Sequence, residues 1–124
     1  MPDLVSIRRS LLELHRQLLE AQRMQAERFG GRMSSGAVLQ AATEDWRFSW
    51  LKELSELIAA FDQARADDDA AATEAAVARA RALLAPPDPE TAFGARYLRA
   101  LQDHPGVVLA HRDATMALMG DQDA

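Results

Sequence analysis

The chain has 124 residues, of which 48% are hydrophobic and 27% charged, the size and balance of one globular domain with a single core. It contains no cysteine, which excludes disulfides, thiolate metal sites and cysteine nucleophiles, and we expect a reducing, cytoplasmic location. The net charge of −5 disfavours a nucleic-acid partner, and the short apolar runs disfavour a membrane span.

The first predicted helix starts after an N-cap at Asp3, reaches about Arg28 and ends at the glycines of residues 30–31. Its apolar residues recur every seven positions in three rows, which together cover an arc of roughly 160°. We therefore expect this helix to pack against more than one neighbour. On the opposite face, arginines and glutamates alternate at spacings that predict ion pairs. The apolar rows are Leu4, Leu11 and Leu18; Ile7, Leu14 and Ala21; and Val5, Leu12 and Leu19.

A polar row, made of Arg8, His15 and Gln22, runs down the middle of this apolar arc. A buried polar group without a partner costs roughly 1–3 kcal/mol, so these side chains need an explanation. They could pair with carboxylates or carbonyls inside the bundle, or mark a seam between two copies of the chain. The third interpretation is a ligand pocket inside the bundle.

The next two predicted segments follow caps at Ser34 or Ser35 and at residues 43–45, and the second of them ends near Arg65. They could form two helices or one kinked helix. A regular helix would place Trp46 and Trp50 on the apolar face of this second segment. We therefore expect both indoles in the core near one end of the bundle, with an aromatic ligand platform as the alternative. The whole predicted face comprises Trp46, Trp50, Leu54, Leu57, Ile58 and Phe61.

Phe48 falls on a different side of that predicted helix. Together with Met33, it is the predicted exposed apolar spot that a partner covers.

Three further helices are predicted in the second half. An alanine-rich helix covers residues 70–85 after a turn at residues 67–69, the next begins at Asp88 and Pro89, and the last follows a break around Pro105. The fold class is therefore all-α, an up-and-down four-helix bundle of about five to six helical segments whose last helix is broken. We expect one domain over residues 1–119 and a frayed tail over residues 120–124.

Catalytic and metal motifs are absent from the sequence. No serine lies in a nucleophile motif, and there is no phosphate-binding glycine loop. His15, His104 and His111 could hold a divalent metal if they converged, but the Glu-x-x-His pairs of helical metal sites are missing. We predict no catalytic residue, no metal and no cofactor.

The stretch WRFSWLKELSELIAAFD of residues 46–62 follows a long helix rich in leucine, arginine and glutamate. It precedes a helix with Tyr97, Leu98 and Leu101 and the stretch HPGVVLAH of residues 104–111. In these features the chain resembles an uncharacterised bacterial family of short all-helical proteins. The resemblance implies a small cytoplasmic helical protein with no assigned activity and no known functional residues.

Two functional hypotheses follow. The first is a non-enzymatic bundle that acts through protein–protein contact, most simply as a homodimer, through apolar surface on the first helix or around Phe48. The second is a small-molecule or metal-binding bundle with an internal polar pocket. Its predicted pocket residues are Arg8, His15, Gln22 and His111, with Trp46 and Trp50 near the mouth.

A third interpretation is DNA association through Arg9, Arg16 and Arg23 of the first helix. It is the weakest of the three because glutamates alternate with these arginines.

Overall fold

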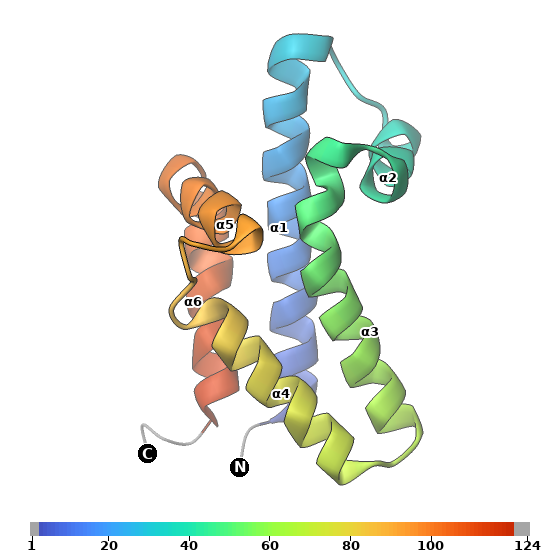
Figure 1. The fold of residues 1–124 in the computed structure, drawn as a ribbon, viewed down its shortest axis with the longest axis vertical. Coiled ribbons are helices and arrows are strands. Elements are labelled where there is room, and N and C mark those ends of the chain that lie inside the picture. The colour runs from blue at the N-terminus through green and yellow to red at the C-terminus, as the bar shows by residue number, and fades with distance from the viewer. Residues whose placement is uncertain (1–2, 121–124) are drawn as a thin grey trace.

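The computed structural model describes residues 3–120, with the side chains of Phe29, Thr43 and Glu44 left aside. All regular structure in this range is helical, which confirms the predicted fold class (Figure 1). The predicted frayed tail lies outside the described residues, apart from Gly120. The elements are α1 (Leu4–Gly30), α2 (Ser35–Glu44), the 3₁₀ helix η1 (Trp46–Leu51), α3 (Lys52–Ala66), α4 (Ala70–Leu84), α5 (Ala92–Asp103) and α6 (Pro105–Met119).

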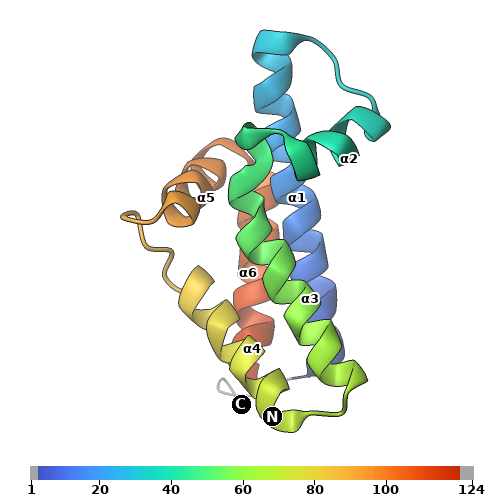
Figure 2. The same ribbon diagram turned by 45° about the vertical axis from the view of Figure 1, so that its right-hand side comes forward.

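Four long helices form the bundle, and their directions alternate along the chain (Figures 1 and 2). α1 contacts α3 and α6, and α4 contacts the same two helices, so the four close a ring around the core. α2, η1 and α5 gather at one end of this bundle. The predicted break before the last helix is present, because α5 ends at Asp103 and α6 begins at Pro105.

The predicted N-caps are confirmed by hydrogen bonds from backbone N–H groups. The side chains of Asp3, Ser34, Asp45 and Asp69 each accept such a bond at the start of a helix. At its other end, α1 stops at Gly31, whose φ of +81° favours glycine. These local signals set the helix boundaries independently of the core.

The predicted start of the fifth helix was wrong by one turn. The chain from Asp88 to Thr91 forms a turn in which the N–H of Glu90 donates to the Asp88 carboxylate (2.9 Å) and the Thr91 hydroxyl donates to the Asp88 carbonyl (2.9 Å). α5 then begins at Ala92 with Thr91 as its N-cap. The aspartate therefore stabilises the turn before the helix instead of capping the helix itself.

The core follows the predicted heptad rows of α1 only in part. Ile7, Leu14 and Leu18 are fully buried, but Val5 is 54% exposed and Leu12 is 39% exposed. These two side chains line a shallow groove beside Arg65 of α3. The apolar arc of α1 is therefore wider than the surface that its own bundle covers.

Two aromatic residues, Trp46 and Phe48, have the opposite burial from the one predicted, whereas Trp50 is half-buried and packs against the core. Phe48 is fully buried, whereas Trp46 is 73% exposed. The reason is the 3₁₀ geometry of η1, with three residues per turn, which aligns Phe48, Leu51 and the following Leu54 on one face. All three are core residues, at 0%, 3% and 0% exposure. Trp46, by contrast, is on the outside of this turn.

Met33, the other half of the predicted exposed spot, is half-buried and packs against the core. Its N–H donates to the Glu27 carboxylate (2.7 Å), which also accepts from Arg23 (3.2 Å). These contacts hold the connection after α1 and lower the pKa of Glu27. Predicted ion pairs of α1 form at Arg16, with Glu13, and at Arg23.

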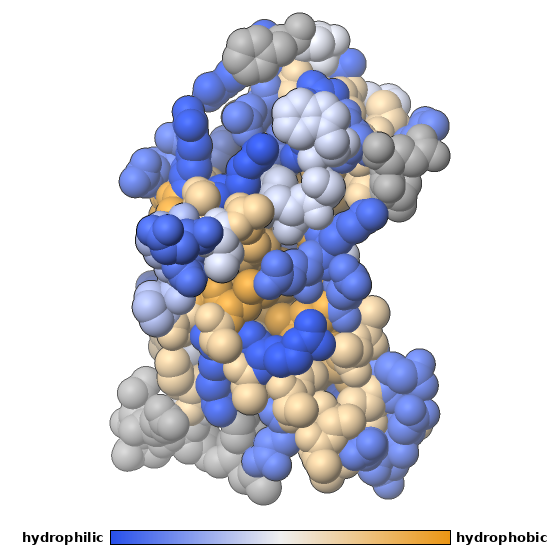
Figure 3. All heavy atoms as spheres, in the orientation of Figure 1, coloured by the Kyte–Doolittle hydropathy of each residue, from blue (hydrophilic) through white to orange (hydrophobic). Residues whose placement is uncertain are grey.

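On the side of α4 and α5, hydrophilic atoms cover most of the upper part of the surface and moderately apolar atoms cover much of the lower part, while the most hydrophobic atoms gather between these two helices (Figure 3). Where α4 meets α6, Arg81 Nε donates to the carbonyl oxygen of Leu118 (2.8 Å), near the end of α6. No described helix combines the length and apolar character that a bilayer span requires.

Candidate functional site

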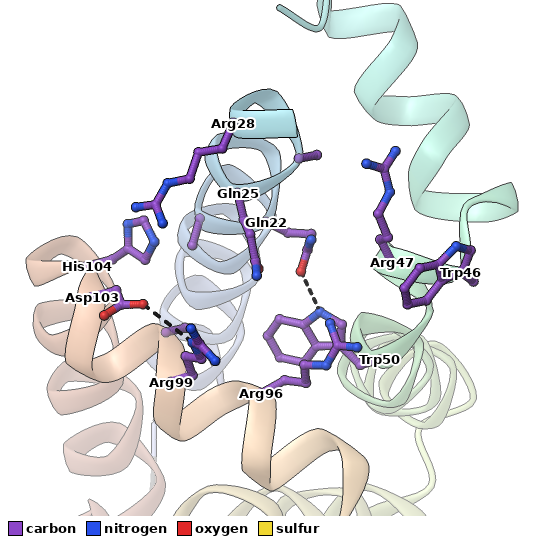
Figure 4. A pocket seen from close by; sticks show the side chains of 13 residues that line it. Gln22, Gln25, Arg28, Trp46, Arg47, Trp50, Arg96, Arg99, Asp103 and His104 are labelled. Carbon is purple, nitrogen blue, oxygen red and sulfur yellow. Dashed lines mark hydrogen bonds and ion pairs between the residues drawn. The ribbon is translucent and has the colours of Figure 1, made fainter. Parts of the chain in front are cut away.

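A cleft opens at the end of the bundle where η1 and α5 face the second half of α1 (Figure 4). Its volume is about 540 Å³, within the range of roughly 300–1,000 Å³ that ligand sites occupy. The lining comes from α1, η1, α5 and the junction of α5 with α6. It consists of Ala21, Gln22, Gln25, Ala26, Arg28, Trp46, Arg47, Trp50, Arg96, Arg99, Ala100, Asp103 and His104.

Trp50 forms a fixed wall of this cleft. Its indole Nε1 donates to the side-chain oxygen of Gln22 (2.9 Å), a residue that is only 4% exposed. The centroid of its ring lies 5.6 Å from the centroid of the Phe93 ring. The buried amide of Gln22 thus has the partner that its position required. The hydrogen bond to Gln22, drawn in Figure 4, and the ring contact with Phe93 together restrict the indole.

A chain of aromatic contacts holds α5 in place between η1 and α6. Phe93 stacks on Tyr97 at 5.3 Å, and Tyr97 lies 5.4 Å from the ring of His111. The Tyr97 hydroxyl and His111 Nδ1 are 2.6 Å apart. Burial raises the pKa of Tyr97 and lowers the pKa of His111, so the phenol and the imidazole are both neutral at pH 7.

The other predicted residues of the polar row lie outside the cleft. Arg8 pairs with Asp62 of α3 (2.9 Å), and His15 is half-buried with its pKa lowered by burial. Arg8 is fourteen residues before Gln22 on the same helix, roughly 21 Å along its axis. The structure therefore brings Gln22, Trp46 and Trp50 together and leaves Arg8, His15 and His111 elsewhere.

The histidines do not assemble a metal site within the described range. His15 belongs to α1, His104 precedes α6, and His111 is bonded to Tyr97. Among the described residues, no group of three or more histidine, aspartate or glutamate side chains could hold an ion.

The cleft is strongly cationic. Arg47 is paired with Asp45 through two nitrogens, Nη2 at 2.6 Å and Nε at 3.1 Å, and this pairing lowers the pKa of Asp45. Arg99 is within 3.9 Å of Asp103. Arg28 and Arg96 have no carboxylate partner among the side chains that the structure describes. Guanidinium groups stay protonated at any physiological pH, so this charge is permanent.

The sequence gives little sign of this arginine cluster. Arg28, Arg47, Arg96 and Arg99 lie on three separate elements, and each of them follows the pattern of a solvated helix face. Thirteen of the fourteen basic residues are arginine, so no single arginine stands out by type. Only the packing of α5 against η1 and α1 places the four side chains around one cleft.

Stability should fall as the pH drops below 6.5, because of His15 and His111. Both pKa values are lowered by burial from an ordinary 6.5. As the pH falls, these two histidines are therefore protonated in the unfolded chain before they are protonated in the folded protein. The free energy of unfolding decreases from about pH 6.5 downwards. The pKa of Glu13 is lowered from 4.5, so the loss of stability caused by protonation of this carboxylate begins only at lower pH. Urea unfolding at a series of pH values measures this dependence.

The matched control is the double variant His15→Gln and His111→Gln. Its absolute stability can differ, but its free energy of unfolding should be nearly flat between pH 6.5 and about pH 4.5. A parent protein without a slope in this window would contradict the prediction.

No protein-family model, curated protein or solved structure matches this chain. The cleft is therefore interpreted from its own geometry and charge.

Proposed function

We propose that the protein is a binding module that holds an anionic ligand in the cleft between α1, η1 and α5. The observation that carries this proposal is a cleft lined by four arginines, two of which, Arg28 and Arg96, have no carboxylate partner among the described side chains. The chain as a whole has a net charge of −5, so this cationic site contrasts with the rest of the protein. An anion bound in the cleft would neutralise the charge of these two guanidinium groups.

The chemistry of the lining suits carboxylate or phosphate groups. A guanidinium presents parallel N–H donors that match both anions, and Arg28 and Arg96 are free to make such bonds within the described structure. The fixed indole of Trp50 supplies an apolar wall against which the rest of a ligand can pack. We propose binding without chemistry because the described lining holds no nucleophile paired with a base.

Both tryptophans of the chain line this cleft, so their fluorescence reports directly on a bound ligand. Titration with inorganic pyrophosphate at constant ionic strength should give a saturable change. The variant Arg96→Gln should weaken binding about tenfold or more, because a charged hydrogen bond contributes roughly 1.5–3 kcal/mol.

The matched control is Arg79→Gln, which removes an exposed arginine of α4 outside the cleft. Its affinity for pyrophosphate should stay within about twofold of the parent value, since charges beyond a Debye length of about 8 Å are screened. Absence of a saturable signal, or equal weakening by both variants, would count against the proposed site.

Protein–protein contact is the second candidate function. Val5 and Leu12 leave apolar surface exposed on α1, as this hypothesis requires, whereas the fully buried Phe48 cannot serve as a contact. Sedimentation of the parent protein and of Leu12→Glu would test whether this surface joins two copies.

We also propose a cytoplasmic location and a bacterial origin within a family of short helical proteins.

A further inference from the structure

Trp46 lies where three hollows of the surface meet. The cationic cleft, a second hollow beside α3 and a third beside α2 all include this residue in their lining. Its indole is 73% exposed, although tryptophan is among the largest apolar side chains. An uncovered tryptophan at the junction of three hollows is typical of a contact residue at the centre of a binding surface.

The chemistry changes along this surface. Met33 and Ala37 supply apolar atoms to the hollow beside α2, next to Trp46, and its polar lining includes Asp45 paired with Arg47. On the other side of the indole, the cleft presents Arg28 and Arg96. An occupant that fills both hollows must therefore carry an apolar group and, a short distance away, one or more carboxylates or phosphates.

We infer that the occupant is an extended acidic segment of a partner protein, which places an apolar side chain against Trp46 and its carboxylates against Arg28 and Arg96. This inference rests on the proposed function, because it names the source of the anion. A small anion in the cleft would leave Trp46 uncovered. A long polyanion would meet Glu53 and Glu56, which line the hollow beside α3.

The experiment uses the peptide Gly-Leu-Glu-Glu-Phe-Glu-Gly-amide with fluorescein on its N-terminal amine, and measures its anisotropy with the full chain at neutral pH. A second peptide has serine in place of leucine and phenylalanine, and an oligothymidylate serves as the nucleic-acid probe. The apolar peptide should bind at least about tenfold more tightly than the serine peptide. Trp46→Ala should weaken binding of the apolar peptide by about tenfold or more.

The control for Trp46→Ala is Leu39→Ala, which shortens an exposed apolar side chain of α2 at 68% exposure, outside the three hollows. It should leave peptide affinity unchanged. Equal binding of the two peptides, an effect of Leu39→Ala as large as that of Trp46→Ala, or tighter binding of oligothymidylate would overturn the inference while pyrophosphate binding still supports the anion site. Loss of pyrophosphate binding itself would overturn the proposed function.

Discussion

Replacement of Phe48 by alanine should lower the free energy of unfolding by about 3–5 kcal/mol. The ring is fully buried on the face of η1 that continues into Leu54 of α3. Its removal costs the transfer free energy of the side chain and leaves a cavity that the surrounding helices fill only in part. Because domains of this size have only about 5–15 kcal/mol of stability, the loss would be a large share of the total. Urea unfolding followed by circular dichroism measures it.

Trp46→Ala is the matched control, two positions away in the same short helix. Its indole is 73% exposed, so the free energy of unfolding should change by less than about 0.5 kcal/mol. If the two variants lost similar stability, or if Trp46→Ala lost more, the 3₁₀ geometry of η1 would be wrong and the regular helical wheel would be correct.

Gly94→Ala should destabilise the protein by about 1–3 kcal/mol and weaken anion binding as well. A Cβ atom at this position would overlap the backbone carbonyl of Asp88, and a backbone group cannot rotate away as a flexible side chain can. The first turn of α5 would have to shift, although its Gly94 N–H now donates to Thr91 (2.9 Å). Arg96 and Arg99 follow in the same helix, so the shift would reach the cleft. Urea unfolding and the pyrophosphate titration measure the two effects.

Gly36→Ala provides the comparison, because Gly36 lies in α2 and a methyl group at its Cα would meet no atom within 4 Å. Alanine is the better helix former, so this variant should be unchanged or stabilised by up to about 1 kcal/mol. A Gly94→Ala protein as stable as Gly36→Ala would show that the turn at Asp88 has room to move.

The helix content and most helix ends could be predicted because their causes are local. An N-cap such as Asp69 bonds to the third residue after it, and a glycine such as Gly31 adopts its own backbone conformation. At η1 the prediction failed because the local geometry departs from a regular α-helix. A change from 3.6 to three residues per turn over six residues rotates Trp46 out of the core and Phe48 into it. No single residue of the segment signals that change.

The candidate site was only partly predictable. The polar row of α1 indicated that Gln22 needs a partner, and the structure supplies Trp50. It could not indicate that Arg8 would reach Asp62 on another helix, more than fifty residues away in the chain. The arginines around the cleft each belong to a solvated helix face, and nothing in their spacing shows that these faces meet.

The amino-acid sequence by itself determined the all-α class, part of the heptad core of α1 and most of the positions at which helices start and stop, because apolar periodicity and capping act within a few residues. Tertiary structure alone decided which aromatic ring is buried and which arginines share a cleft. The physical reason is that these outcomes depend on how α5, η1 and α1 pack together, and the contacts between them join residues far apart in the chain.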